Sequence, residues 1–212
     1  MPLELQPATE ADARRSAQIE HEAYAPNPNN KILFPGPFPP NILDLRAGQL
    51  AAELKQDPTT RWLKIIDTDL PADGEQMVAF AKWHVYDDVK PHWKPRTFGA
   101  GCNGEACELL FGGVQTQRER ILAGRNCVYL SLLHTDPKHQ KRGAGELLVK
   151  WGIEEAKKLG LIAYLDSSPA GHSLYRKCGF RDVECLTTDL STWGGITEYT
   201  WSMIYDPAEN AI

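Results

Sequence analysis

Residues 127–145 read CVYLSLLHTDPKHQKRGAG and contain the signals that decide the fold. Residues 127–133 form an apolar run of the length expected for a buried strand. Residues 140–145, QKRGAG, lead directly into an amphipathic pattern over residues 144–159, which Gly160 ends. The spacing therefore predicts a strand, a tight turn and a helix in succession.

The turn at residues 140–145 has the properties of a phosphate-binding loop. The first amides of a helix have no partner inside the helix, and the missing side chains at Gly143 and Gly145 let an anion approach them closely. Lys141 and Arg142 place positive charge where a helix normally favours acidic residues, an inversion that a bound polyphosphate would explain. The turn lacks the Gly-Lys-Ser/Thr ending of a P-loop and the longer G-x-G-x-x-G fingerprint. Two glycines in an ordinary tight turn are the alternative interpretation.

The other elements are predicted from periodicity and turn signals on either side of this motif. Residues 26–40 contain six of the 15 prolines and are expected to form a loop without regular structure. Residues 86–122 are expected to form an insertion between two strands, irregular at first and helical from residue 108. The remaining predicted strands are 2–6, 61–67, 76–85, 161–165, 181–187 and 197–204, and the remaining predicted helices are 9–24, 41–56 and 169–178.

Length and charge limit the function classes. The chain has 212 residues, of which 42% are hydrophobic, enough for one sizeable core and therefore one domain over residues 1–212. Lys and Arg number 23 against 28 Asp and Glu, and this balance argues against a nucleic-acid partner held by phosphate contacts. No segment approaches the roughly 18 apolar residues that a membrane helix needs, so no membrane partner is predicted.

The cysteines and the N-terminal residues indicate a cytoplasmic protein. The five cysteines are scattered and form no C-x-x-C pair, which favours reduced thiols over a disulfide framework or a zinc site. The first residues lack the basic and apolar regions of a signal peptide. The pair His134-x4-His139 is not a convincing metal motif, so no metal is predicted.

Two motifs resemble those of the GNAT N-acetyltransferase superfamily. Gln140-x-x-Gly143-x-Gly145 matches that family's Arg/Gln-x-x-Gly-x-Gly/Ala pyrophosphate motif. Residues 167–180, SSPAGHSLYRKCGF, match its Leu-Tyr-x-x-x-Gly-Phe ending, and the two motifs are separated by one helix and one strand, as in the family.

The resemblance implies an α/β fold with a mixed, mostly antiparallel sheet of about seven strands, flanked by helices on both faces. The sheet is expected to splay between the strand ending at Leu133 and the strand ending at Asp166. Acetyl-CoA is the implied co-substrate, with its pantetheine arm on the backbone of Leu133 and Thr135 and its pyrophosphate on residues 140–145. The implied binding residues are Leu133, His134, Thr135, Gln140, Lys141, Arg142, Gly143, Ala144, Gly145, Ser168, Gly171 and Tyr175.

The implied chemistry is direct attack of a neutral amine on the thioester. Tyr175 matches the tyrosine that in many such enzymes donates a proton to the CoA sulfur, although it can also be a core aromatic. Ser168 either caps the helix that begins at Pro169 or contacts the pantetheine amide.

Three residues are candidates for the base that accepts the amine proton. His134 and His84 lie at strand ends and can titrate near neutrality, although the ring of His134 can also point away from the site. Asp166 ends a strand at the expected splay and can instead orient a water or a loop. Deprotonation through water without a single base is the alternative.

We expect the acceptor to be the primary amine of a small molecule. The Pro-rich loop, the insertion and the late turn contribute aromatic side chains that suit an apolar amine, although each can equally be core under a long loop. These aromatics are Tyr24, Phe34, Phe38, Trp83, Tyr86, Trp93, Phe98 and Trp193.

Two other functions stay open. A protein or peptide acetyltransferase would dock its partner on the insertion and predicts a shallow open groove, whereas a small-molecule enzyme predicts a closed pocket under the Pro-rich loop. An acidic cluster for a polycationic acceptor requires folding to bring together Asp87, Asp88, Glu105 and Glu108. A non-catalytic acyl-CoA-binding module is the other alternative, and the presence of Tyr175 argues against it. We expect a monomer or a homodimer.

Overall fold

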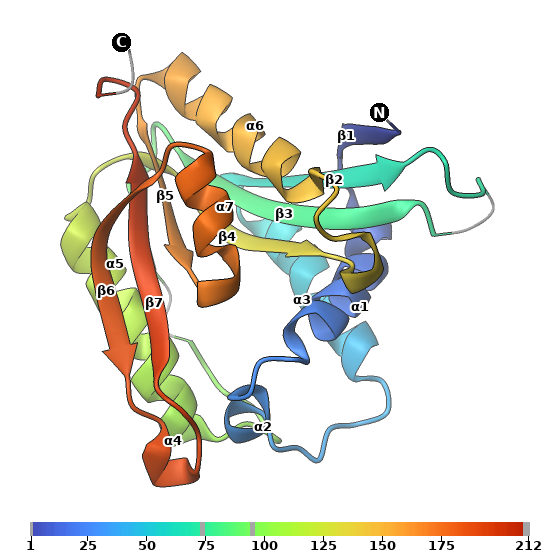
Figure 1. The fold of residues 1–212 in the computed structure, drawn as a ribbon, viewed down its shortest axis with the longest axis vertical. Helices are drawn as coiled ribbons and strands as arrows, with labels where there is room; N and C mark the ends of the chain where they lie inside the picture. The colour runs from blue at the N-terminus through green and yellow to red at the C-terminus, as the bar shows by residue number, and fades with distance from the viewer. Residues whose placement is uncertain (1, 73–74, 94–95, 210–212) are drawn as a thin grey trace.

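The computed structural model describes residues 2–72, 75–93 and 96–209. Within these residues, seven strands form one sheet in the order β1-β2-β3-β4-β5-β7-β6 (Figure 1). In the same part of the chain, β4 and β5 are the one parallel pair of neighbours. The predicted mixed, mostly antiparallel sheet is therefore confirmed. The strands are β1 Leu3–Pro7, β2 Thr60–Asp67, β3 Met77–Tyr86, β4 Cys127–Thr135, β5 Ile162–Ser167, β6 Arg181–Thr188 and β7 Glu198–Tyr205.

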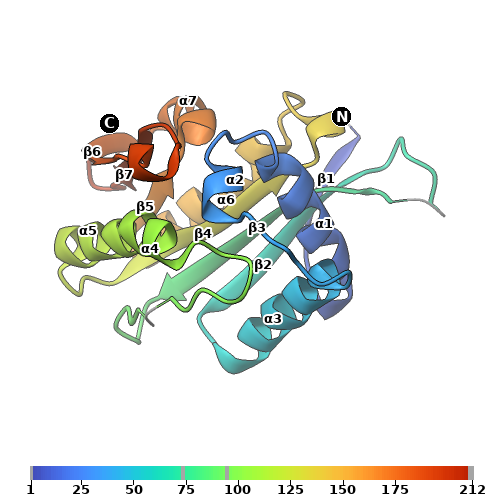
Figure 2. The same ribbon diagram turned by 90° about the horizontal axis from the view of Figure 1, so that it is seen from below.

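Helices cover both faces of this sheet, as predicted. In Figure 1, α6 lies above strands β2 to β4, and α1 and α3 lie below them. Figure 2 shows α5 and α4 beside α2, on the same side of the sheet as α1 and α3. The helices are α1 Ala13–Tyr24, α2 Asn30–Leu33, α3 Ile42–Gln56, α4 Gly104–Cys107, α5 Gly113–Leu122, α6 Ala144–Leu159 and α7 Pro169–Lys177.

The parallel ladder between β4 and β5 ends early. It pairs Cys127 with Ile162 and stops at Leu130 and Leu165, although each strand continues beyond this pair. On the other edge of β4, the register with β3 shifts so that Ser131 is an extra residue. Such a bulge bends the strand that contains it. The two central strands therefore separate at the place where the splay was expected.

The amphipathic pattern explains why α6 ends where it does and what it covers. Its buried side includes Leu148, Val149 and Ile153, and Gly160 ends the helix in the left-handed conformation. At Gly152 the helix meets the fully buried ring of Trp83, which occupies the space that a Cβ would need. This close approach fixes the distance between α6 and β3.

Replacing Gly152 by alanine is expected to destabilise the fold. A Cβ at this position overlaps the Trp83 ring, and overpacking of this kind costs about 1–3 kcal/mol, more than the roughly 1 kcal/mol that alanine adds to a helix. Urea denaturation of both proteins measures the difference. Gly48→Ala is the matched control, because a Cβ at Gly48 in α3 meets no atom within 4 Å. A rise in stability for both variants would contradict this account of the packing.

The structure corrects the predictions in two loops. The Pro-rich segment contains the four-residue helix α2, which is too short to show a hydrophobic period. In the insertion, helical structure begins at Gly104 and not at residue 108, because the Asn103 side chain accepts a hydrogen bond from the Ala106 amide and caps α4. A π-helical turn over Glu108–Gly112 connects α4 to α5.

The Pro-rich loop, the insertion and the β6–β7 turn pack on one another. Leu33, Cys107 and Leu190 are buried together in a small cluster apart from the main core. Asn29 is fully buried, accepts a hydrogen bond from the Ile196 amide at 2.9 Å and donates one to Glu198 at 2.7 Å. Three segments that are distant in sequence are thereby joined.

Candidate active site

The separation of β4 and β5 leaves backbone groups of β4 without a strand partner. The Asp136 amide donates to the Val78 carbonyl of β3 at 2.8 Å. Because successive residues of a strand direct their backbone groups to opposite edges, Leu133 and Thr135 present theirs to the edge that β5 has left. These are the two residues at which the family resemblance implies pairing with the pantetheine arm.

Two side chains donate hydrogen bonds to the carbonyl groups at this edge. The Tyr24 hydroxyl donates to the Leu133 carbonyl, and the Gln140 side chain donates to the Thr135 carbonyl, each at 3.3 Å. Tyr24 is 43% exposed, so its contact with Leu133 lies at the protein surface, beside the gap between β4 and β5. An extended ligand can replace either of these hydrogen bonds without breaking the pairing between two strands.

The turn before α6 presents open amides. Lys141 has φ of 60° and Gly143 has φ of 95°, so both lie in the left-handed region. Within the described residues, the amides of residues 141–146 donate no hydrogen bond, and the first bond of the helix runs from Leu147 to Gly143. A Cβ at Gly143 would meet no atom within 4 Å. Open donors facing open space are what an anion site at a helix N-terminus requires.

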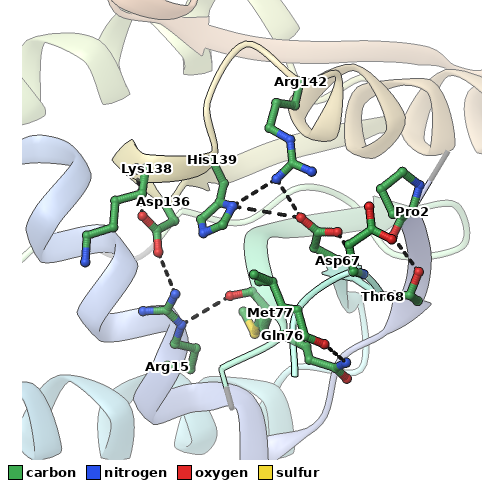
Figure 3. Close-up of polar contacts among 12 residues, drawn as sticks. Pro2, Arg15, Asp67, Thr68, Gln76, Met77, Asp136, Lys138, His139 and Arg142 are labelled. Carbon is green, nitrogen blue, oxygen red and sulfur yellow. Dashed lines mark hydrogen bonds and ion pairs between the residues drawn. The ribbon is translucent and has the colours of Figure 1, made fainter. Parts of the chain in front are cut away.

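The two basic residues of this turn have different surroundings. Arg142 donates from Nη1 to Oδ2 of Asp67 at 2.6 Å and contacts Nδ1 of His139 at 2.9 Å (Figure 3). Lys141 is exposed and makes no ion pair within the part of the chain that the structure describes. Lys141 is therefore available to a ligand, whereas Arg142 is held at the end of β2.

Tyr175 lies in α7 on the α6 side of the sheet. It is 7% exposed and packs edge-on against Phe180, with ring centroids 6.1 Å apart. A Cβ at Gly171 would be 2.8 Å from the Tyr175 ring, so the glycine makes room for it. Burial raises the pKa of Tyr175 above that of an ordinary phenol, and no described residue hydrogen-bonds its hydroxyl. The hydroxyl therefore stays protonated at neutral pH.

Ser168 precedes α7, but its side chain does not cap the helix. Its carbonyl accepts hydrogen bonds from the Ser167 hydroxyl and from the amides of Gly171 and His172. The capping interpretation of its hydroxyl is therefore wrong. Contact of Ser168 with the pantetheine amide stays a prediction.

The ring of His134 lies inside the protein on the α1 side of the sheet. It is 2% exposed, stacks on Phe80 and has Nε2 3.1 Å from the Ser16 hydroxyl. Burial lowers the pKa of His134 to about 4. This placement corresponds to the alternative in which the ring points away from the site and only the backbone lies near it.

His84 lies on the same face, opposite Tyr129 in the β3–β4 ladder. Its Nδ1 is 3.2 Å from Oδ2 of Asp57 and 3.2 Å from the Thr59 hydroxyl, and its ring stacks between Tyr86 and Tyr129. Burial lowers the pKa of His84, and the hydrogen bond that its ring donates to the Asp57 carboxylate opposes this shift. A neutral ring at physiological pH is compatible with a base.

Asp166 is engaged by several donors. Arg118 of α5 donates to it at 2.7 Å, and the hydroxyls of Tyr164 and Ser202 donate at 2.8 and 3.1 Å. The side chains of Arg118 and Asp166 are both less than a tenth exposed. A carboxylate held in this way fastens α5 to the sheet and has few lone pairs left for a proton.

The predicted acceptor wall is only partly assembled. Trp83 packs under α6 on the opposite face, so its assignment to the wall is wrong. Phe34, Phe98 and Trp193 belong to the small cluster described above, which agrees with their alternative interpretation as core. The structure does not bring the four acidic candidates together, because they line two different hollows. Asp87 and Asp88 line one, and Glu105 and Glu108 line the other.

Asn29 and Asp67 contribute to this region without any role assigned from sequence, and Tyr24, expected as an aromatic of the acceptor wall, makes a backbone contact that was not expected. Tyr24 contacts the Leu133 backbone, Asn29 joins two loops, and Asp67 holds Arg142. Their partners are between 75 and 169 residues away, and no local pattern signals such a pairing. Among the described residues, no group of three or more His, Cys, Asp or Glu side chains is placed to hold a metal ion. In those residues, no helix has the length and apolar character needed to cross a membrane.

Comparisons with known proteins agree with this geometry. Residues 55–180 match the sequence profile of the acetyltransferase (GNAT) family. A 44-residue segment is 46% identical to the probable acyltransferase SID5 of Ajellomyces capsulatus; it covers 21% of this chain and only 32% of that protein.

Two solved structures share the fold over nearly the whole chain. One, described as histone acetyltransferase HPA2 and related acetyltransferase, comes from Corynebacterium glutamicum; it has a TM-score of 0.62 and 22% identity and covers 98% of this chain and 97% of that one. The other is yncA of Salmonella typhimurium, a putative acetyltransferase with its cofactor acetyl-CoA, with a TM-score of 0.60, 15% identity and coverage of 97% and 94%. Since the profile spans more than half of its residues, the chain belongs to the acetyltransferase (GNAT) family and is an acyltransferase.

Proposed function

We propose that this protein transfers the acetyl group of acetyl-CoA to the primary amine of a small molecule. The observation that carries the proposal is the separation of β4 and β5, toward which Leu133 and Thr135 direct their backbone groups. The open amides of residues 141–146 begin the helix that follows this strand. Together they suit a donor with an extended arm and a diphosphate. The proposed diphosphate site also includes Gln140, Lys141 and Ala144. The proposed pantetheine site also includes Ser168 and Gly171.

In the proposed reaction, the neutral amine nitrogen forms a bond to the thioester carbon and the carbon–sulfur bond breaks. Tyr175 gives its proton to the sulfur, and the amine proton passes to a base or to water. The protonated state of Tyr175 is compatible with this role, because a general acid must carry its proton at the working pH, and burial raises the pKa of this phenol. Tyr175 packs in the core cluster under α6, and His84 stacks on Tyr129 on the other face of the sheet, so the donor and the acceptor can approach from opposite sides.

Replacing His84 by glutamine is expected to remove the acidic limb of the pH–rate profile. A base must be deprotonated, so activity falls as the pH drops through its pKa, and burial places that limb below pH 6.5 for His84. The measurement is kcat/KM against pH for the wild type and His84→Gln, with His134→Ala for comparison. A limb that persists in His84→Gln would assign the proton to Asp166 or to water.

The acceptor class rests on the closure of the acceptor side. Asn29 and the cluster around Leu33 and Leu190 tie the Pro-rich loop to the insertion and to the β6–β7 turn. Loops that pack on one another in this way favour an enclosed acceptor pocket over an open groove, and an enclosed pocket is what a small-molecule acceptor requires.

A protein or peptide acceptor is the second candidate. The outer side of the insertion has an open groove of about 770 Å³ lined by Glu105, Glu108, Leu109 and Trp193. A shallow groove on the insertion is the feature that a docked protein acceptor predicts. Comparing the rate of acetyl transfer to small amines with the rate of transfer to peptides distinguishes the two acceptor classes.

The proposal is tested by a thermal-shift titration with acetyl-CoA and with CoA, followed by thiol release with aryl, alkyl and peptide amines. A ligand that binds the native state raises the melting temperature by mass action. We expect stabilisation by both nucleotides and thiol release with a small amine. Release with peptides alone favours the second candidate, and stabilisation without any release favours a binding module. An unchanged melting temperature would overturn the proposal.

Location and assembly stay predictions from sequence. We propose a cytoplasmic enzyme that acts as a monomer or a homodimer, with no nucleic-acid or membrane partner and no metal. The composition and the scattered free cysteines support this proposal.

A further inference from the structure

The turn before α6 is fastened to the end of β2 by a buried carboxylate. Asp67 is the last residue of β2 and is 1% exposed. Its Oδ2 accepts the hydrogen bond from Arg142, and its Oδ1 accepts one from the Asp69 amide at 3.2 Å. Its own amide donates to the Gln76 carbonyl at 2.8 Å. The carboxylate is therefore held by its own loop as well as by the turn, and Figure 3 shows Asp67 directed toward Arg142.

A second buried carboxylate fastens the start of the same segment. Asp136 accepts a hydrogen bond from the Lys138 amide at 2.9 Å and another from Arg15 of α1 at 2.6 Å. Arg15 also donates to the Met77 carbonyl at 3.1 Å (Figure 3). Residues 136–142 are thus held at both ends, by β2 through Asp67 and by α1 through Asp136.

These contacts restrain the part of the turn that has the least favourable backbone conformation. Lys141 is in the left-handed region without being a glycine, and such a conformation persists only when surrounding contacts hold it. Arg142 is the next residue, and Gly143 after it is left-handed again. The ion pair of Arg142 with Asp67 at 2.6 Å restrains this part of the turn, next to the contact of Arg142 with Nδ1 of His139 at 2.9 Å. The Arg142 hydrogen bond also lowers the pKa of Asp67, which keeps the carboxylate ionised.

We propose that Asp67 is a positioning residue for the acyl donor, holding the turn through Arg142 in the shape that binds the diphosphate. Lys141 supplies the positive charge to the diphosphate, and Arg142 supplies the shape of the turn. The inference rests on the proposed function, in which residues 140–145 hold the diphosphate of acetyl-CoA.

Charge alone predicts the opposite effect of losing Asp67. An aspartate near a diphosphate repels it, so removing the negative charge would strengthen binding if coulombic repulsion dominated. Removing the charge-assisted hydrogen bond frees Arg142 and the turn, so binding weakens if positioning dominates. The sign of the change in affinity therefore separates the two effects.

The experiment measures acetyl-CoA binding by calorimetry for the wild type, Asp67→Asn and Asp69→Asn. Asp69 is the matched control, because it is exposed, lies two residues away and loses the same charge while keeping its amide. We expect Asp67→Asn to weaken binding about tenfold, the usual scale for a hydrogen bond to a charged group. We expect Asp69→Asn to leave the affinity unchanged or slightly higher.

Two further measurements separate positioning from a general loss of structure. Binding of acetyl-pantetheine, which lacks the diphosphate, is followed at millimolar concentration by ligand-observed NMR and should be the same in Asp67→Asn and the wild type. Arg142→Gln should reproduce the loss for acetyl-CoA, and the double variant should lose no more than either single variant, because both break one contact.

The inference is overturned if Asp67→Asn binds acetyl-CoA as tightly as the wild type or more tightly. It is also overturned if the variant loses acetyl-pantetheine to the same extent, which indicates general destabilisation. Failure of the wild type to bind acetyl-CoA would overturn the proposed function as well, so the two failures are distinguishable.

Discussion

Replacing Gly143 by glutamate is expected to abolish the binding of acetyl-CoA. The amides of residues 141–146 are open, and the space in front of Gly143 is empty to at least 4 Å. A glutamate side chain fills that space with a negative charge. Juxtaposed like charges cost several kcal/mol, so calorimetry should show a loss of at least about 100-fold in affinity.

Gly143→Gln is the control for this variant. Gly143 has φ of 95°, so any side chain strains the turn, and glutamine adds the same strain and nearly the same volume without the charge. We expect glutamine to weaken binding and glutamate to weaken it much further. Equal affinities for the two variants would assign the effect to strain, and wild-type affinity for Gly143→Glu would show that the diphosphate site lies elsewhere.

Replacing Tyr175 by phenylalanine is expected to lower kcat about 100-fold, at the lower end of what a general acid contributes. The ring contacts with Phe180 and over Gly171 are kept, and only the hydroxyl is lost. The affinity for acetyl-CoA should therefore be unchanged. Steady-state kinetics with the amine found by thiol release and calorimetry with acetyl-CoA separate the two quantities.

The pH dependence provides a second test of Tyr175. An acid works only while protonated, so activity is lost as the pH rises through its pKa, which burial raises above 10 for this residue. A wild-type kcat with no alkaline limb below pH 10 agrees with the assignment. Tyr205→Phe is the control, because Tyr205 is equally buried in the same core cluster. An unaffected rate in Tyr175→Phe would show that the tyrosine is structural and that the thiolate leaves unaided.

The core of the fold was predictable because its signals are local. The apolar run of β4, the glycines of the turn and the period of α6 each lie within a few residues, and α6 begins and ends where the pattern places it. Contacts between residues that are distant in sequence have no such local signal. Arg142 was expected to face the diphosphate, but its partner is Asp67, 75 residues earlier, and a single basic residue beside a glycine turn does not indicate which way its side chain points.

Trp83 shows a different limit. Most of β3 is buried on both faces, and the face that carries Lys82 and His84 is covered by α1 just as the other face is covered by α6, so burial does not follow the polar pattern of the strand. The sequence could therefore assign Trp83 to a strand but not to a face. His84, the next residue, points to the opposite side, where it meets Asp57. Only the packing of α6 through Gly152 decides between the two sides.

The extra residue in β4 determines which backbone groups face the opening between the strands. Tyr129 and His134 are five residues apart, an odd number, yet both rings lie on the α1 side, which an unbroken two-residue alternation does not allow. Ser131 changes the parity of everything after it. In a strand one residue shorter at this point, Leu133 and Thr135 would exchange edges with their neighbours, and no side-chain substitution could restore them. The length of this strand is therefore as much a part of the site as the identity of any residue in it.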